Sequence, residues 1–214
     1  MQSYNLCGGA IVSGSFQGFD QSYLIETLKK LGPSFVGVTQ LPCTVSNKEI
    51  IELNEFGVRA VRFNLKRGGS ENVRHLSSFA SRVHEIANWH VELYVDSADL
   101  PDLYKILIEL PSVSIDHLGL SQVQFKTLVR LAEKGVRIKA TGFGRVDFSV
   151  KEALQELYSV NPNSLMFGTD LPSTRAPRMY SDNDFILVAE TLGSEGANNV
   201  LSKNAINFYR PKSG

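Results

Sequence analysis

Two side chains that can do acid–base chemistry follow short apolar segments of this chain. Asp170 comes directly after Leu165-Met-Phe-Gly-Thr169, and His117 comes shortly after Ser112-Val-Ser-Ile115. A carboxylate in this position can serve as general base toward water or as a metal ligand. A histidine can act as an acid or base, polarise a carbonyl group, or bind a metal. Asp170 and His117 are therefore the candidate catalytic residues; the alternatives are a loop-capping carboxylate before Pro172 and a structural histidine.

Arginines in unusual surroundings are candidates for anion binding. Arg62 lies inside the apolar run Ala60-Val-Arg-Phe63, so its guanidinium needs either an internal carboxylate or an anionic ligand as partner. Arg145 ends the glycine-rich segment Thr141-Gly-Phe-Gly-Arg145, where backbone can approach a ligand closely. Arg67 precedes Gly68-Gly69, and for it the alternative is a solvated loop residue.

Several other chemistries have no motif in the sequence. There is no G-x-S-x-G, C-x-x-C or H-E-x-x-H, which disfavours a serine hydrolase and excludes self-contained zinc sites of those types. Cys7 and Cys43 are the only cysteines, which favours a reducing compartment, and we expect both to be packing residues. His75 and His84 fall on a polar helical pattern, and we expect them to face solvent. The residues alone therefore assign no metal ligand and no cofactor.

Short apolar runs alternate with amphipathic helical patterns along the chain. This alternation predicts repeated βα units. Strands are predicted at 9–13, 35–40, 58–65, 90–95, 113–117, 136–142 and 164–169. Helices are predicted at 21–31, 46–56, 71–88, 100–110, 121–134, 150–160, 181–192 and 195–208.

Repeated βα units can form an open sheet or a closed barrel. No glycine-rich phosphate loop follows the first strand, which disfavours a nucleotide-binding open sheet. Polar residues instead follow nearly every strand, a pattern typical of the mouth of a (β/α) barrel. The fold class predicted is α/β and TIM-barrel-like, with seven strands where a closed barrel has eight. No linker interrupts residues 1–214, so we predict a single domain.

Composition limits the partners. Lys+Arg and Asp+Glu both number 22, and such neutrality gives no electrostatic footprint for nucleic acid or an anionic membrane. No apolar run reaches the roughly 18 residues of a transmembrane helix. The N-terminal residues lack the pattern of a signal peptide. We therefore predict a cytoplasmic protein whose partner is a small molecule.

The ordered set of motifs resembles the amidohydrolase superfamily, specifically the TIM-barrel metal-dependent hydrolases of the 2-pyrone-4,6-dicarboxylate lactonase type. Each motif is weak alone, but their order covers nearly the whole chain. The matching stretches are Ile11-Val-Ser-Gly-Ser15 with Gly18-Phe-Asp20, Gly57-Val-Arg-Ala-Val-Arg-Phe-Asn64, His90-Val-Glu-Leu-Tyr94, Ile115-Asp-His-Leu-Gly119, Val136-Arg-Ile-Lys-Ala-Thr-Gly142 and Leu165-Met-Phe-Gly-Thr-Asp-Leu-Pro172.

The resemblance implies roles for individual residues. Asp170 would activate water and His117 would polarise the scissile carbonyl. The positions that would contact a carboxylated substrate are Ser15, Arg62, Arg67, Tyr94 and Arg145. The family's first strand carries a His-x-His pair, which this sequence lacks. The resemblance therefore implies an N-terminally incomplete barrel without strand one, with two unpaired sheet edges unless a second copy or a rearrangement covers them.

Two functions are consistent with these patterns. The first is a hydrolase that acts on a small carboxylated lactone or ester. The alternative is a degenerate, non-catalytic barrel that binds an anionic metabolite or a partner protein. A third interpretation keeps a divalent metal such as zinc at His117 and Asp170.

Overall fold

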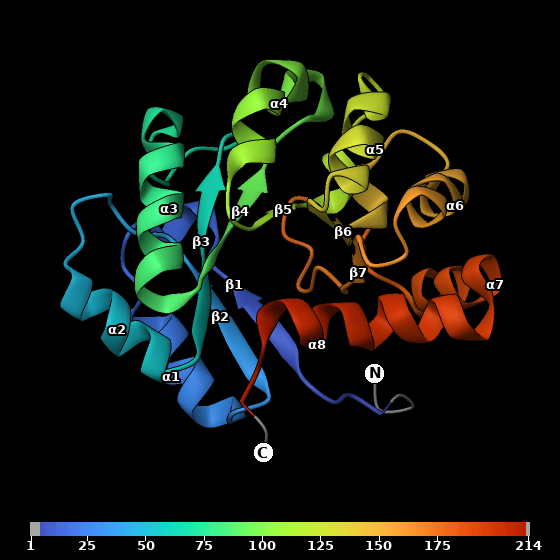
Figure 1. The fold of residues 1–214 in the computed structure, drawn as a ribbon. Helices are drawn as coiled ribbons and strands as arrows, with labels where there is room; N and C mark the ends of the chain where they lie inside the picture. The colour runs from blue at the N-terminus through green and yellow to red at the C-terminus, as the bar shows by residue number, and fades with distance from the viewer. Residues whose placement is uncertain (1–4, 213–214) are drawn as a thin grey trace. The chain divides into compact units, whose positions relative to one another are not determined.

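The computed structural model describes residues 5–212, which divide into two compact units (Figure 1). The N-terminal unit comprises Asn5–Tyr94, Glu109–Val113 and the residues from Tyr209 onward. The C-terminal unit comprises Val95–Ile108 and Ser114–Phe208. Seven strands lie in the described residues, the number predicted from the sequence. No helix among them is long and apolar enough to cross a membrane.

Four parallel strands form the sheet of the N-terminal unit, and neighbours in sequence are neighbours in the sheet. They are β1 (Gly9–Val12), β2 (Phe35–Thr39), β3 (Val58–Asn64) and β4 (His90–Tyr94). All residues of β3 and β4 are buried, as expected for strands covered on both faces. The register of these two strands places Arg62 opposite Glu92 and Asn64 opposite Tyr94.

Helices α1 (Ser22–Leu31), α2 (Asn47–Glu55) and α3 (Leu76–Ala87) pack against these strands (Figure 1). The short helical turn η1 (Ser15–Gln17) follows β1, and the short helical turn η2 (Val73–His75) precedes α3. α2 has an N-terminal cap, because the Ser46 hydroxyl accepts a hydrogen bond from the Glu49 amide at 3.1 Å. α3 begins later than predicted, since η2 occupies part of the segment expected to be its first turns.

The C-terminal unit holds β6 (Arg137–Ala140), β7 (Leu165–Phe167) and most of β5 (Val113–Ile115), again parallel and in chain order. Its helices are α4 (Leu100–Glu109), α5 (Phe125–Glu133), α6 (Val150–Val160), α7 (Asp182–Asn198) and α8 (Asn204–Tyr209), the last residues of α4 and α8 belonging to the other unit. Short helical turns are η3 (Ser97–Asp99), η4 (His117–Gly119), η5 (Phe143–Arg145) and η6 (Asn199–Lys203).

The strands of the C-terminal unit end earlier than predicted, and this changes the setting of the candidate residues. β5 ends at Ile115, so His117 opens the turn η4 rather than closing a strand. β7 ends at Phe167, so Thr169 lies in the following loop. Gly193 has φ +67 and interrupts α7 close to the predicted break between the last two helices. The polar residues after the strands are therefore held by turns, which can aim side chains in directions that a strand does not allow.

Candidate functional site

His117, Arg145 and Asp170 come together in the C-terminal unit. Each follows a different strand, β5, β6 or β7, because the carboxyl ends of parallel strands meet at one edge of a sheet. Arg145 Nε donates a 2.6 Å hydrogen bond to Asp170 Oδ2. His117 Nε2 lies 3.9 Å from the other carboxylate oxygen, Oδ1. All three side chains are at most 15% exposed, so their mutual attraction is screened less than on an open surface.

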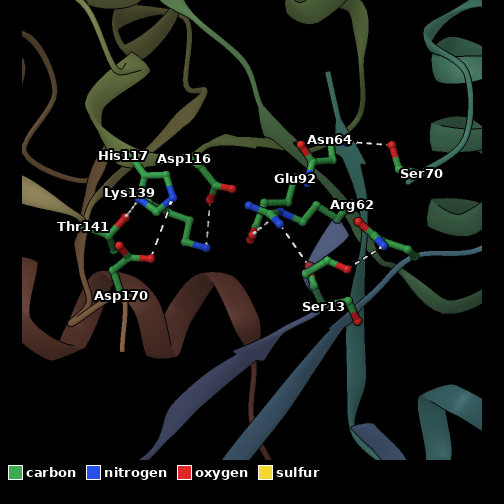
Figure 2. Close-up of polar contacts among 12 residues, drawn as sticks. Ser13, Arg62, Asn64, Ser70, Glu92, Asp116, His117, Lys139, Thr141 and Asp170 are labelled. Carbon is green, nitrogen blue, oxygen red and sulfur yellow. Dashed lines mark hydrogen bonds and ion pairs between the residues drawn. The ribbon is translucent and has the colours of Figure 1, made fainter. Parts of the chain in front are cut away.

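Thr141 fixes the histidine ring from the other side. Its hydroxyl lies 2.8 Å from His117 Nδ1, as Figure 2 shows, and Thr141 itself is buried at the end of β6. When the hydroxyl donates to Nδ1, the neutral ring carries its proton on Nε2, the nitrogen that faces Asp170. The hydrogen bond therefore fixes the orientation of the ring, and which of its two partners donates decides the tautomer.

The backbone around the two catalytic candidates adopts positive φ. Asp170 has φ +57 and His117 has φ +51, values that Asp and His tolerate better than most residues. The next residue, Leu118, also has φ +52 and is completely buried. A leucine in this region costs about 1–2 kcal/mol, which the packing of its side chain must offset. Backbone strain of this kind clusters at functional sites, and here it coincides with the turn that presents His117.

Gly142 makes room for the whole cluster. Its φ is +60, and a Cβ there would lie 2.8 Å from His117 Nδ1, 2.9 Å from Arg145 Cδ and 3.1 Å from Asp170 Oδ2. The glycine-rich segment was expected to let backbone approach a ligand. Its first glycine instead lets three side chains from three strand ends converge.

A buried ion pair lies in the same unit. Lys139 Nζ on β6 is 3.0 Å from Asp116 Oδ1, and their side chains are 11% and 1% exposed (Figure 2). Neither residue was singled out from the sequence as a site residue. The pair holds the residue before His117 to the middle strand of the unit, so it anchors the turn that carries the histidine.

Geometry tests whether His117 and Asp170 could hold a metal. Zinc sites take three or four protein ligands, and this pair offers two. Within the unit, Thr141 contacts His117, and the cationic Arg145 already occupies Asp170 Oδ2. Two ligands beside a guanidinium do not fit a zinc centre, so we assign the chemistry of this cluster to its side chains.

Arg62, Arg67 and Tyr94 come together in the N-terminal unit. The guanidinium carbons of Arg62 and Arg67 lie 5.0 and 5.8 Å from the centre of the Tyr94 ring, within the range of cation–π attraction. Arg67 is exposed, on a loop that folds back onto β3 because its amide donates to Asn64 Oδ1 at 3.0 Å. Ser15 borders the same loop, since a Cβ on Gly69 would lie 2.3 Å from the Ser15 carbonyl oxygen.

Arg62 has the internal carboxylate that was one of its two predicted partners. Its Nε lies 3.8 Å from Glu92 Oε1 across the β3–β4 pair, and its Nη1 donates to the Ser13 carbonyl at 2.9 Å (Figure 2). Glu92 is completely buried and also accepts a hydrogen bond from Tyr209 at 3.0 Å. Sequence reasoning missed Glu92, although a charged residue inside His90-Val-Glu-Leu-Tyr94 is the same signal that singled out Arg62.

Comparisons with known proteins agree with this fold. The model of the amidohydrolase family (Amidohydro_2) matches residues 7–210. A 2-pyrone-4,6-dicarboxylate hydrolase of Comamonas testosteroni is 32% identical over 112 residues, which are 51% of this chain and 36% of that protein. A 4-sulfomuconolactone hydrolase of Rhizobium radiobacter is 25% identical over 208 residues, covering 87% of this chain and 69% of that protein.

A solved structure extends the likeness to the whole chain. The crystal structure of a candidate 2-pyrone-4,6-dicarboxylic acid hydrolase from Pseudomonas putida superposes with a TM-score of 0.85 at 26% identity. The superposition covers 100% of this chain and 85% of the Pseudomonas putida chain. The fold class is therefore α/β and TIM-barrel-like, with seven strands in the described residues, as predicted. The match to the Comamonas protein spans only about a third of that relative's length.

Proposed function

The chain belongs to the amidohydrolase family, and from this premise we propose that it hydrolyses a small lactone that carries a carboxylate or another anionic group. The relatives named above act on a pyrone dicarboxylate and a sulfomuconolactone, both small lactones with anionic groups. The observation that carries the proposal is the convergence of His117, Arg145 and Asp170 at three strand ends.

Asp170 is the proposed general base. Its Oδ2 is held by Arg145, which leaves Oδ1 directed toward His117 Nε2 at 3.9 Å. A separation beyond 3.5 Å suits a bridging water, which could hydrogen-bond to both atoms. Asp170 would remove a proton from this water as its oxygen attacks the carbonyl carbon of the lactone.

His117 is the proposed electrophile. With Thr141 donating to Nδ1, Nε2–H can donate to the carbonyl oxygen as negative charge develops on it. The ring C–O bond then breaks, and the leaving oxygen takes the proton that Asp170 received from water. The product is an open-chain hydroxy acid, or its keto form when the leaving oxygen is enolic, and Asp170 is a carboxylate again.

Anion binding is the proposed role of Arg62, Arg67, Tyr94 and Ser15 in the N-terminal unit and of Arg145 in the C-terminal unit. Arg67 supports this role best, because its guanidinium is exposed and lies over an aromatic ring that steadies it. Arg62 is already paired with Glu92, so it would attract an anion through its positive charge as well as through direct contact.

The test compares Asp170→Asn with the parent chain, using 2-pyrone-4,6-dicarboxylate and 4-sulfomuconolactone as substrates. Asparagine tolerates the positive φ of this position and keeps an oxygen that can accept from Arg145, so the variant should fold while it loses the carboxylate charge and the base. We expect kcat to fall by about 10²–10⁴-fold, the usual contribution of a general base. Asp102→Asn, at an exposed position on α4, is the matched control and should keep the parent rate. An Asp170→Asn variant as active as the parent would rule out this assignment.

The second candidate function is binding of an anionic metabolite without chemistry. It is favoured by Arg145, whose guanidinium is tied to the proposed base and to the Thr174 carbonyl at 3.1 Å. Calorimetry with the same dicarboxylate distinguishes the two functions. Binding that is lost in Arg67→Ala, together with no turnover by the parent, would favour this candidate over the hydrolase.

A further inference from the structure

A cluster of potential metal ligands lies in the N-terminal unit, on residues that the proposed hydrolysis does not use. Cys43, Glu71 and His75 each offer a ligand atom, and these atoms all lie within 4.8 Å of one another. The three residues are partly buried and come from two segments, the turn between β2 and α2 and the segment that leads into α3. We propose that they form a binding site for a zinc ion.

Hydrogen bonds already join the segments that carry Cys43 and Glu71. The Cys43 amide donates to Glu71 Oε2 at 2.6 Å, and the Asn72 amide donates to Glu71 Oε1 at 2.6 Å. Arg82 on α3 donates to the Cys43 carbonyl at 2.9 Å and to Asn47 Oδ1 at 3.0 Å. These bonds join the turn after β2 to α3 without using the thiol, so the ligands are prearranged for an ion.

The donor set selects the kind of cation. A thiolate, an imidazole and a carboxylate favour zinc over magnesium or calcium, which take oxygen ligands. Zinc bonds of about 2.0–2.3 Å in tetrahedral geometry keep ligand atoms roughly 3.5 Å apart, so the side chains need to close by about 1 Å. Water would complete the fourth position, as in zinc sites with three protein ligands.

Charge balance also suits a divalent ion. A thiolate and a carboxylate together neutralise Zn²⁺, and the thiol proton leaves to solvent when the metal binds. The hydrogen bond to Glu71 raises the pKa of the Cys43 thiol, so zinc binding has to displace this proton. Arg74 Nε lies 2.9 Å from His75 Nε2, and its exposed side chain can move into solvent when the imidazole binds the ion.

The experiment titrates the full chain, stripped with a chelator, with zinc chloride in a calorimeter. We expect one equivalent of zinc to bind and to raise the melting temperature, because the ion binds the folded state. Cys43→Ser and His75→Gln should each weaken binding by about 100-fold or more. Cys7→Ser is the matched control, because Cys7 is the other cysteine and is exposed. Magnesium should not replace zinc.

A second measurement keeps the test decisive if Cys43→Ser fails to fold. In the Cys7→Ser variant Cys43 is the sole thiol, and zinc should protect it from a thiol reagent. With cobalt in place of zinc, a thiolate-to-metal charge-transfer band should appear in Cys7→Ser. The proposal fails if the parent binds no zinc, if zinc leaves the Cys43 thiol reactive, or if His75→Gln keeps the parent affinity.

Discussion

The two compact units differ in how they use buried charge. In the N-terminal unit, Arg62 and Glu92 face each other within the sheet, on neighbouring strands, and their side chains are 8% and 0% exposed. In the C-terminal unit, Arg145 and Asp170 meet beyond the ends of the strands, on turns, and their side chains are 9% and 15% exposed. The first pair lies within the sheet, whereas the second pair lies on turns that follow the strands.

This difference separates stability from chemistry. A charge inside a sheet is costly to uncover, so a change at Glu92 acts on the free energy of unfolding. A charge on a turn with positive φ can be altered with less effect on the fold, so a change at Asp170 acts on turnover.

The largest expected effect is on the stability of the N-terminal unit. Glu92→Gln leaves the Arg62 guanidinium buried without its carboxylate, which should lower the free energy of unfolding by about 3–5 kcal/mol. The double variant Arg62→Met/Glu92→Leu removes both charges and should recover much of that loss. Urea unfolding measures both, with Glu85→Gln at an exposed helix position as the control. A Glu92→Gln variant as stable as the parent would contradict the role given to this pair.

The next effect concerns Gly142 in the C-terminal unit. Gly142→Ala puts a methyl group against His117, Arg145 and Asp170, and displacement of such groups by about 1 Å can lower kcat about 10²-fold. Gly135→Ala is the matched control, because Gly135 also has positive φ (+96) but no atom within 4 Å of the added Cβ. Both variants should lose about 1–2 kcal/mol of stability from backbone strain. Equal turnover in the two variants would show that crowding at Gly142 does not matter.

The sequence predicted the elements better than the contacts between them. Short apolar runs located all seven strands, because this signal depends on residues close together in the chain. The partner of Arg62 required the register of β3 against β4, which no local pattern contains. Arg145 and Asp170 were each predicted as site residues, but their mutual bond depends on two turns whose conformation the sequence did not specify.

The proposed zinc ligands were missed for a related reason. Cys43 lies far in sequence from Glu71 and His75, so the set matches no short motif. His75 was expected to face solvent on a helix, but α3 begins at Leu76 and His75 belongs to the preceding turn, where it is partly buried. The one local signal was the spacing of Glu71 and His75, four residues apart, which in a helix would place both on one face.

A smaller effect is expected from the buried Lys139–Asp116 ion pair. Changes to this pair test whether buried charge in the C-terminal unit also stabilises the fold. Lys139→Met and Asp116→Asn should each destabilise the chain, and a double-mutant cycle should give a coupling energy of about 0.5–3 kcal/mol. Hydrolysis should fall together with stability in these variants, since the pair anchors the turn before His117. A coupling energy near zero would mean that the two charges are held by other neighbours.

The smallest effect should come from Thr141, and it distinguishes positioning from packing. Thr141→Val keeps the shape of a buried side chain and removes the hydroxyl that meets His117 Nδ1. Loss of one hydrogen bond corresponds to about 0.5–1.5 kcal/mol, or up to roughly tenfold in kcat. Thr141→Ser restores the hydroxyl and should recover kcat even though it leaves a small cavity. Since the hydroxyl forms a hydrogen bond to the ring of His117, the pH profile of kcat should shift in Thr141→Val and return in Thr141→Ser. Loss of kcat in Thr141→Ser with no loss in Thr141→Val would mean that Thr141 matters only through its methyl group, and the histidine would then be oriented by the turn alone.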